Sequence, residues 1–310
     1  MTSTAVERAP SLPPPSDGGG ARRAERVSRS KTVTATALIG PATIFIAVCL
    51  LAPLAILLRY SLNDFEPTRK MMIEAVTIAN YVKFFTDPYY TTILGTTVRI
   101  AVTVTVACLI IGFPLAYVVA RSQSRFKHLL IIAIVLPLFV GNAVRAAGWM
   151  VVFGSKGFFN STLIDLGVIA TPFEIMFTEK AVIIGIIAVN LPFMVLSLQS
   201  VIESIDRSVE EAAFSLGAPP LTMFRRVLWP LALPGVLAGT ILTFILGMNA
   251  YATPFLLGGP LFKMMAPVLY NEFTQKTNWP FGGAIAFILM AVTLTLTIVA
   301  NLVLQRRVAR

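Results

Sequence analysis

The residues between Glu203 and Pro230 have types and spacing that suit one kind of chemistry, hydrogen bonding to the free backbone groups at helix ends. Ser208 and Glu211 have the spacing of a capping box, which satisfies the free backbone N–H groups at a helix start. Gly217 is placed to end that helix because glycine takes a left-handed conformation at little cost. One interpretation of such a loop is an amphipathic hairpin that lies at the membrane surface and binds no partner protein.

A second short helix is expected after this corner. Pro219 and Pro220 suit its first turn, where a missing backbone N–H costs little. Arg225 and Arg226 lie near its end, and Pro230 is expected to interrupt it before the next apolar run. The sequence therefore predicts a helix-turn-helix loop at 203–230, between two apolar spans.

Two arginines lie inside apolar segments. Arg99 and Arg145 are cations at membrane depth, and a charge there is costly enough to make each a functional-site hypothesis. Each arginine either snorkels to the outer interface, or faces a water-lined cavity or a carboxylate of another subunit. The predicted spans themselves contain no Asp or Glu.

Polar and aromatic residues near helix-breaking prolines are candidates for a solute path. They either line such a path or satisfy the backbone groups that the prolines free. Aromatic faces also suit a cationic solute. The candidate path residues are Arg145, Trp149, Asn190, Asn249 and Tyr251.

The elements that must position these residues are membrane helices. The 310 residues are 56% hydrophobic and only 13% charged, which is a membrane composition. A helix needs about 20 apolar residues to cross a bilayer core, and six segments approach that length. We therefore predict an all-α polytopic membrane protein with the spans Val33–Leu58, Ile93–Ala120, Leu129–Phe153, Ala181–Val201, Leu231–Leu257 and Gly283–Leu304.

Charge indicates how these spans are oriented. Residues 1–31 are rich in Pro, Gly, Ser and Arg and predict a disordered cytoplasmic tail, which leaves 32–310 as the membrane domain. Most Lys and Arg residues fall in the tail, the loop near Arg121, the 203–230 loop and the C-terminal end. Cytoplasmic loops carry such an excess, so both termini and the 203–230 loop are expected in the cytoplasm. This distribution argues against nucleic-acid binding.

Several catalytic motifs are absent from the sequence. It contains no G-x-x-x-x-G-K-[ST] phosphate loop, so the chain is not expected to hydrolyse ATP itself. It contains no H-E-x-x-H or G-x-S-x-G motif either. The single histidine and the two cysteines, which lie in apolar runs, offer no metal site or disulfide framework. The sequence therefore predicts no enzyme and no cofactor in this chain.

The central loop resembles the EAA loop of permease subunits of binding-protein-dependent ABC importers. Four features carry the resemblance: Glu211-Ala212-Ala213, the spacing to Gly217, the following Ala218, and the Val-Leu-Trp-Pro end at Pro230. In that family the loop is a cytoplasmic coupling helix that docks on the ATPase. The resemblance thus implies a type I importer permease of the bacterial inner membrane, working by alternating access. It also implies two ATPase subunits that use ATP, a second homologous permease and a periplasmic solute-binding protein.

Two further stretches resemble the spermidine/putrescine branch of these permeases. They are Val144–Trp149, followed by Gly157–Asn160, and Tyr251–Pro260. The resemblance implies that the transported solute is small and that a polyamine is the first candidate, although related permeases carry other solutes. A secondary transporter working alone is the competing function, but it would need acidic residues within its spans. A membrane enzyme is a third possibility.

Overall fold

The computed structural model describes residues 18–308 apart from 69–70 and 124, and the chain divides into two units after Leu57. The first unit holds most of helix α1 (Gly18–Ser61), whose stretch Gly40–Ser61 is long and apolar enough to cross a membrane. Residues 18–31, predicted as part of a disordered tail, belong to this helix; four of them are arginine and two are alanine, both good helix formers. The rest of the predicted tail, residues 1–17, lies outside the described residues.

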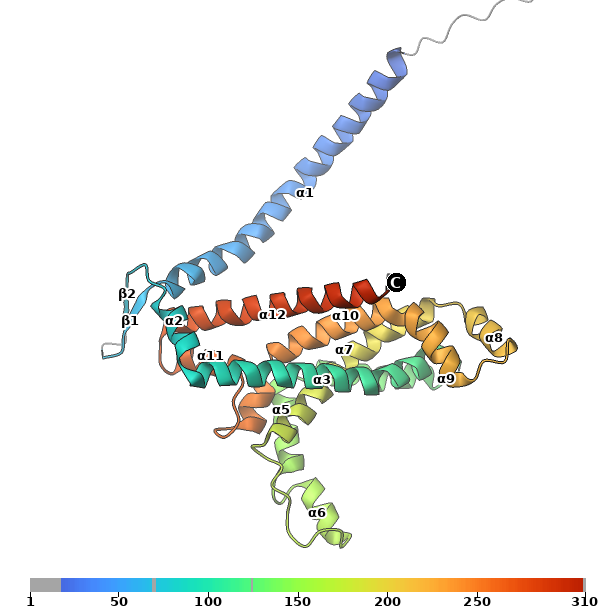
Figure 1. The fold of residues 1–310 in the computed structure, drawn as a ribbon. Coiled ribbons are helices and arrows are strands. Elements are labelled where there is room, and N and C mark those ends of the chain that lie inside the picture. Colours follow the sequence, from blue (N-terminus) through green and yellow to red (C-terminus); the bar gives the residue numbers. More distant parts are fainter. Residues whose placement is uncertain (1–17, 69–70, 124, 309–310) are drawn as a thin grey trace, which may run out of the picture. The chain divides into compact units, whose positions relative to one another are not determined.

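Four long helices build the second unit. Helices α3 (Pro88–Arg121), α7 (Glu179–Ser204) and α10 (Trp229–Met248) pack on one another, and α12 (Trp279–Val308) packs beside α10 (Figure 1). Their facing side chains are almost entirely apolar and buried, so the core lies between these helices. Helices satisfy their own backbone groups, which is what a chain in lipid requires.

Glycines allow α10 to approach its neighbours closely. A Cβ on Gly239 would lie 2.6 Å from Sδ of Met194 on α7, and a Cβ on Gly247 would lie 3.3 Å from Cα of Ala101 on α3. Small residues at helix contacts permit this close packing in membranes. Gly141 and Gly148, in contrast, face open space in the described part of the chain.

The third predicted span, Leu129–Phe153, is broken. Its two halves, Lys127–Phe139 and Asn142–Asp165, meet at an angle of 101°. Pro137 lies in a 3-10 turn before the break and Gly141 lies at it, and both residues disfavour a continuous helix. The elements of this region are α4 (Lys127–Val135), η1 (Leu136–Phe139), α5 (Asn142–Phe153) and α6 (Phe158–Asp165).

The fifth predicted span, Leu231–Leu257, ends earlier than expected. Helix α10 stops at Met248, because Asn249 turns out of helical geometry and Pro254 opens a separate short helix. Within the described residues, five helices are long and apolar enough to cross a membrane, and the bent pair makes up to six. The all-α polytopic prediction is confirmed, apart from one small hairpin.

Apart from α4–α6, the short elements of this unit lie toward the two ends of the bundle (Figure 1). In the hairpin, Phe65 pairs with Met72 in antiparallel register. One end holds β1 (Asp64–Glu66), β2 (Met71–Ile73), α2 (Ala79–Thr86) and α11 (Met265–Thr274), with η3 (Pro254–Gly258) between α10 and α11. The other end holds α8 (Arg207–Ser215), α9 (Pro220–Met223) and η2 (Phe224–Leu228).

Candidate functional site

The N-cap of helix α8 lies two residues before the predicted cap at Ser208. This N-cap is Asp206, whose Oδ1 accepts a hydrogen bond from the backbone N–H of Ser208 at 2.9 Å. This hydrogen bond lowers the pKa of Asp206. The capping box expected at Ser208 and Glu211 is therefore wrong, because aspartate at the earlier position already satisfies a free N–H.

Gly217 forms the corner, as the sequence predicts. Its φ is +78°, in the left-handed region that glycine adopts readily. The N–H of Ala218 reaches the carbonyl of Ala213 at 3.0 Å and that of Gly217 reaches Phe214 at 2.9 Å, which is a Schellman motif. Helix α9 then begins at Pro220, also as predicted.

Pro230 does not interrupt the second helix. Residues Pro220–Met248 form one continuous helical rod that passes from α9 through η2 into α10. The π turn of η2, in which the N–H of Trp229 bonds to the carbonyl of Phe224, widens the helix just before the proline. A wider turn accommodates the proline ring, which would otherwise press on the preceding turn.

Glu210, which sequence reasoning missed, holds α8 against α3. The glutamate is only 7% exposed, and its Oε1 accepts hydrogen bonds from Nε and Nη2 of Arg121 at 2.8 and 2.5 Å. Tyr117 donates to its Oε2 at 2.9 Å. Arg121 and Tyr117 are four residues apart on α3, so they share one face of that helix. That spacing was the available sequence signal.

Two more contacts join the same elements. Arg207 donates to the carbonyl of Arg121 at 2.8 Å, so the start of α8 also bonds to the end of α3. The ring of Phe113 on α3 lies 5.1 Å from Phe224 and 5.5 Å from Trp229, centroid to centroid. The loop is thus fastened to α3 from both of its helices.

The predicted recognition residues lie on the outer side of this loop. Glu211 and Ala212 are exposed beside the buried Glu210, and Ala213 and Ala218 are partly exposed. The apolar side chains of Phe214, Leu216 and Leu221 are also exposed, by 45%, 89% and 68%. An apolar patch rimmed by charge is typical of a protein-binding surface. Pro230 is exposed but lies further along the rod.

Two of the predicted path residues share one face of α5. Nη2 of Arg145 hydrogen-bonds to Asn142, while its Nε and Nη1 are buried without a partner among the described residues. Trp149, one turn later, stacks on Phe153 at 4.9 Å. Helix α5 packs against η3, which begins three residues after Tyr251.

The other three path candidates differ in exposure. Asn190 is only 1% exposed and donates to the carbonyl of Thr243 at 3.2 Å, so it ties α7 to α10. Asn249 is exposed at the end of α10 and donates to the carbonyl of Ile245 at 2.9 Å. Tyr251 lies in an aromatic cluster, 4.7 Å from Tyr270 and 5.4 Å from Phe255, centroid to centroid.

Arg99 has a partner in its own chain. Its Nη2 contacts Oε2 of Glu179 at 2.7 Å, and the two side chains are 61% and 35% exposed. Helix α7 begins at Glu179, two residues before the span predicted from hydropathy, so the carboxylate reaches the arginine. The predicted spans contained no Asp or Glu, but the spanning helix α7 itself carries Glu179 at its first position.

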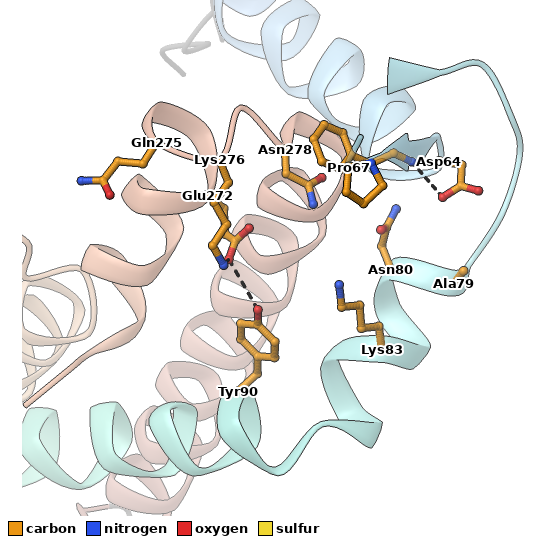
Figure 2. Close-up of a pocket in the computed structure, with 11 residues that line it drawn as sticks. Asp64, Pro67, Ala79, Asn80, Lys83, Tyr90, Glu272, Gln275, Lys276 and Asn278 are labelled. Atoms are coloured by element: carbon orange, nitrogen blue, oxygen red, sulfur yellow. Dashed lines mark hydrogen bonds and ion pairs between the residues drawn. The ribbon is translucent and has the colours of Figure 1, made fainter. Parts of the chain in front are cut away.

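A pocket of about 500 Å³ is lined by residues of β1, α2 and α11 and the start of α3. These elements lie at the end of the bundle away from α8 and α9 (Figure 1). Tyr90, Lys83 and Asn80 reach into it from α3 and α2 (Figure 2). Glu272 and Lys276 belong to the segment on its other side. Sequence reasoning missed Glu272, whose spacing of four residues to Lys276, the spacing of neighbours on a helix face, was the available signal.

Comparisons with known proteins agree with this architecture. The family model described as "Binding-protein-dependent transport system inner membrane component" matches residues 108–310. The chain is 37% identical to the spermidine/putrescine transport system permease protein PotB of Haemophilus influenzae, over 75% of this chain and 82% of that protein. It is also 37% identical to PotB of Escherichia coli, over 74% and 80%.

The solved structures show the same fold. A bacterial alginate ABC transporter, crystallised with a periplasmic protein bound to an alginate pentasaccharide, superposes with a TM-score of 0.69 at 18% identity, covering 92% of this chain and 97% of that chain. The family match covers more than half of the sequence. The long apolar helices of the chain are those of a multi-pass membrane protein. This chain therefore belongs to the inner-membrane components of binding-protein-dependent transport systems, which are permease subunits of ABC importers and not enzymes.

Proposed function

We propose that this permease moves a polyamine, such as spermidine or putrescine, into the cell. The supporting observation is the 37% identity over about three quarters of the chain to two permeases with that name. The resemblance at Val144–Trp149 and Tyr251–Pro260 to the same branch agrees with it. Another small solute carried by the same class of importer is the alternative.

The proposed orientation places both termini and the loop that holds α8 and α9 in the cytoplasm. The excess of Lys and Arg in the tail, in this loop and at the C-terminal end supports it. In this orientation the end of the bundle with α2 and α11 faces outward, where solute arrives. The membrane domain would comprise residues 32–310, with 203–230 as its coupling loop.

The proposed partners are two ATPase subunits, a second permease and a periplasmic solute-binding protein. Family membership supports this set, and one structural neighbour was solved with its periplasmic protein. The patch formed by Glu211, Phe214 and Leu216 suits a groove on the ATPase, since it offers one carboxylate and exposed apolar side chains.

The contact of Arg121 with Glu210 carries the proposed coupling mechanism. ATP-driven movement of the ATPase subunits displaces α8, and the buried hydrogen bonds of Glu210 transfer that displacement to α3. The aromatic contacts of Phe113 with Phe224 and Trp229 transfer the motion of the second loop helix. A spanning helix that moves with the loop is what alternating access requires.

We also propose that Arg145, Trp149, Asn249 and Tyr251 line the solute path, because Arg145 and Trp149 lie on α5, which packs against η3, and Asn249 and Tyr251 lie between α10 and η3. Asn190 has a structural role in this conformation, since its side chain is buried between α7 and α10.

The test is transport by the complete importer in lipid vesicles, with ATP on the ATPase side. Radiolabelled spermidine, putrescine and sulfate are supplied with the binding protein, and uptake is compared with and without ATP. We expect ATP-dependent uptake of one or both polyamines and none of sulfate. ATP-dependent uptake of sulfate without either polyamine would overturn the proposal.

A further inference from the structure

The pocket in Figure 2 has a buried carboxylate in its wall. Glu272, on α11, is only 2% exposed, although it borders the pocket of about 500 Å³ and a neighbouring pocket of about 430 Å³. Its Oε1 accepts a hydrogen bond from the hydroxyl of Tyr90 at 3.4 Å. A buried carboxylate needs a cation beside it, because an unpaired charge there is costly.

Lys276 supplies that cation, and its side chain is free to move away from Glu272 into water. Nζ of Lys276 contacts Oε1 of Glu272 at 2.7 Å, yet the lysine side chain is 53% exposed and the glutamate side chain only 3%. The lysine ammonium regains full hydration when it swings into water, while the carboxylate stays in place. Any other alkylammonium ion that enters can take the same position without changing the local charge.

The rest of the surroundings also suits alkylammonium groups. Nζ of Lys83 lies 4.7 Å from the centroid of the Phe281 ring, and Nζ of Lys263 lies 5.9 Å from that of Tyr89. Both are cation–π distances. Asp64 adds a second carboxylate across the pocket from Glu272 (Figure 2). The protein's own lysines thus show where ammonium groups bind.

We propose that Glu272 is a binding site for an ammonium group of the transported polyamine, which enters by displacing Lys276. The inference rests on the proposed function, and it names a site for the solute at the end of the bundle where the proposed orientation receives it. Lys276 acts as a built-in competitor that occupies the carboxylate when no solute is present.

The test uses two substitutions that we expect to change the Kd for spermidine in opposite directions. Glu272→Gln removes the charge that binds the ammonium, and charge-assisted hydrogen bonds contribute about 1.5–3 kcal/mol, so we expect the Kd for spermidine to rise at least about tenfold. Lys276→Gln removes the competitor, so the Kd should fall several-fold. The measurement is equilibrium dialysis of radiolabelled spermidine against the purified importer complex without its binding protein.

Matched controls change the same charges elsewhere. Glu74→Gln and Lys156→Gln alter exposed residues that do not line either pocket, and the Kd should stay at the parent value. A role in stability alone predicts that breaking the pair from either side weakens binding. The inference is therefore overturned if both pocket variants weaken binding or if neither changes it.

The same complexes separate this inference from the proposed function. If the parent importer takes up spermidine or putrescine but the two pocket variants bind spermidine like the parent, only the Glu272 site is wrong. If the parent takes up neither polyamine when its binding protein is present, the proposed function fails first. Should Glu272→Gln fail to assemble, the gain in affinity expected for Lys276→Gln still decides the question.

Discussion

Arg121 donates two hydrogen bonds to a single oxygen of Glu210, at 2.8 and 2.5 Å, across the junction of α3 and α8. The side chains are 13% and 9% exposed, so the pair is largely shielded from water. Breaking a buried pair from one side costs about 3–5 kcal/mol. Each partner would leave an uncompensated buried charge if the other were removed, so the proposed coupling keeps the pair intact while α8 moves.

Glu210→Gln should uncouple transport from ATP hydrolysis. The amide keeps the size of the side chain but cannot hold the Arg121 guanidinium as a charge pair. In reconstituted vesicles we expect uptake per ATP hydrolysed to fall several-fold, with the complex still assembled. A parent-like ratio of uptake to hydrolysis in this variant would remove Glu210 from the coupling mechanism.

Glu211→Ala should instead weaken docking. This carboxylate is exposed, so its loss leaves the contact of α8 with α3 intact and removes only a group available to the ATPase. We expect reduced recovery of the ATPase in a pull-down, and reduced uptake at matched membrane levels. Parent-like recovery and uptake would show that this face of α8 is not the docking surface.

Gly217→Val tests the corner of the loop. A side chain at φ +78° is strained by about 1–2 kcal/mol, and the position has open space around it, so the effect is on the backbone alone. We expect ATPase association and uptake to fall. Gly167→Val is the matched control, because Gly167 has φ +70° and open space but lies in another loop; equal defects in both variants would contradict a specific role for Gly217.

The orientation can be checked by cysteine labelling in intact cells of a strain whose parent permease carries Cys49→Ser and Cys108→Ser. Single cysteines near Gly157 and Lys263 should react with a membrane-impermeant maleimide from outside, and one near Ser208 should react only after the membrane is opened. External labelling at Ser208 would reverse the orientation and place the loop out of reach of an ATPase.

Arg145→Ala tests the cation inside the broken span. Two of its guanidinium nitrogens are buried without a partner in the described chain, so we expect the residue to complete a contact in the assembled importer or along the solute path. Uptake or recovery of the second permease should fall clearly. Arg99→Ala is the comparison, since Arg99 is exposed and paired with Glu179, and its loss should have a small effect. Normal uptake and normal assembly in Arg145→Ala would favour snorkelling.

Local chemistry made the main elements predictable from the sequence. Apolar length identified the membrane helices, and the requirement for φ above zero identified the Gly217 corner. These features depend on neighbouring residues alone. The cap at Asp206 was missed because the sequence offers several good capping residues, and only the folded backbone selects one.

Contacts between residues far apart in the sequence could not be predicted from neighbouring residues in this way. Glu210 and Glu211 look alike in the sequence, and only the packing of α8 on α3 decides which one is buried. Glu272 was overlooked because its depth depends on contacts with a distant helix, among them the hydrogen bond from Tyr90 on α3. The bend of the third span and the wide turn before Pro230 also arise from how the helices pack.

Because the helical rod from Pro220 to Met248 is uninterrupted, a tilt of the rod at the loop moves its far end over a distance set by its length. Its 29 residues make it about 43 Å long at 1.5 Å per residue. A tilt of about 5° at the docking end therefore sweeps the opposite tip through roughly 4 Å, by the same geometry. That tip adjoins Asn249 and Tyr251, so under the proposed coupling a small angular displacement at the loop becomes a movement of several ångströms beside the proposed solute path.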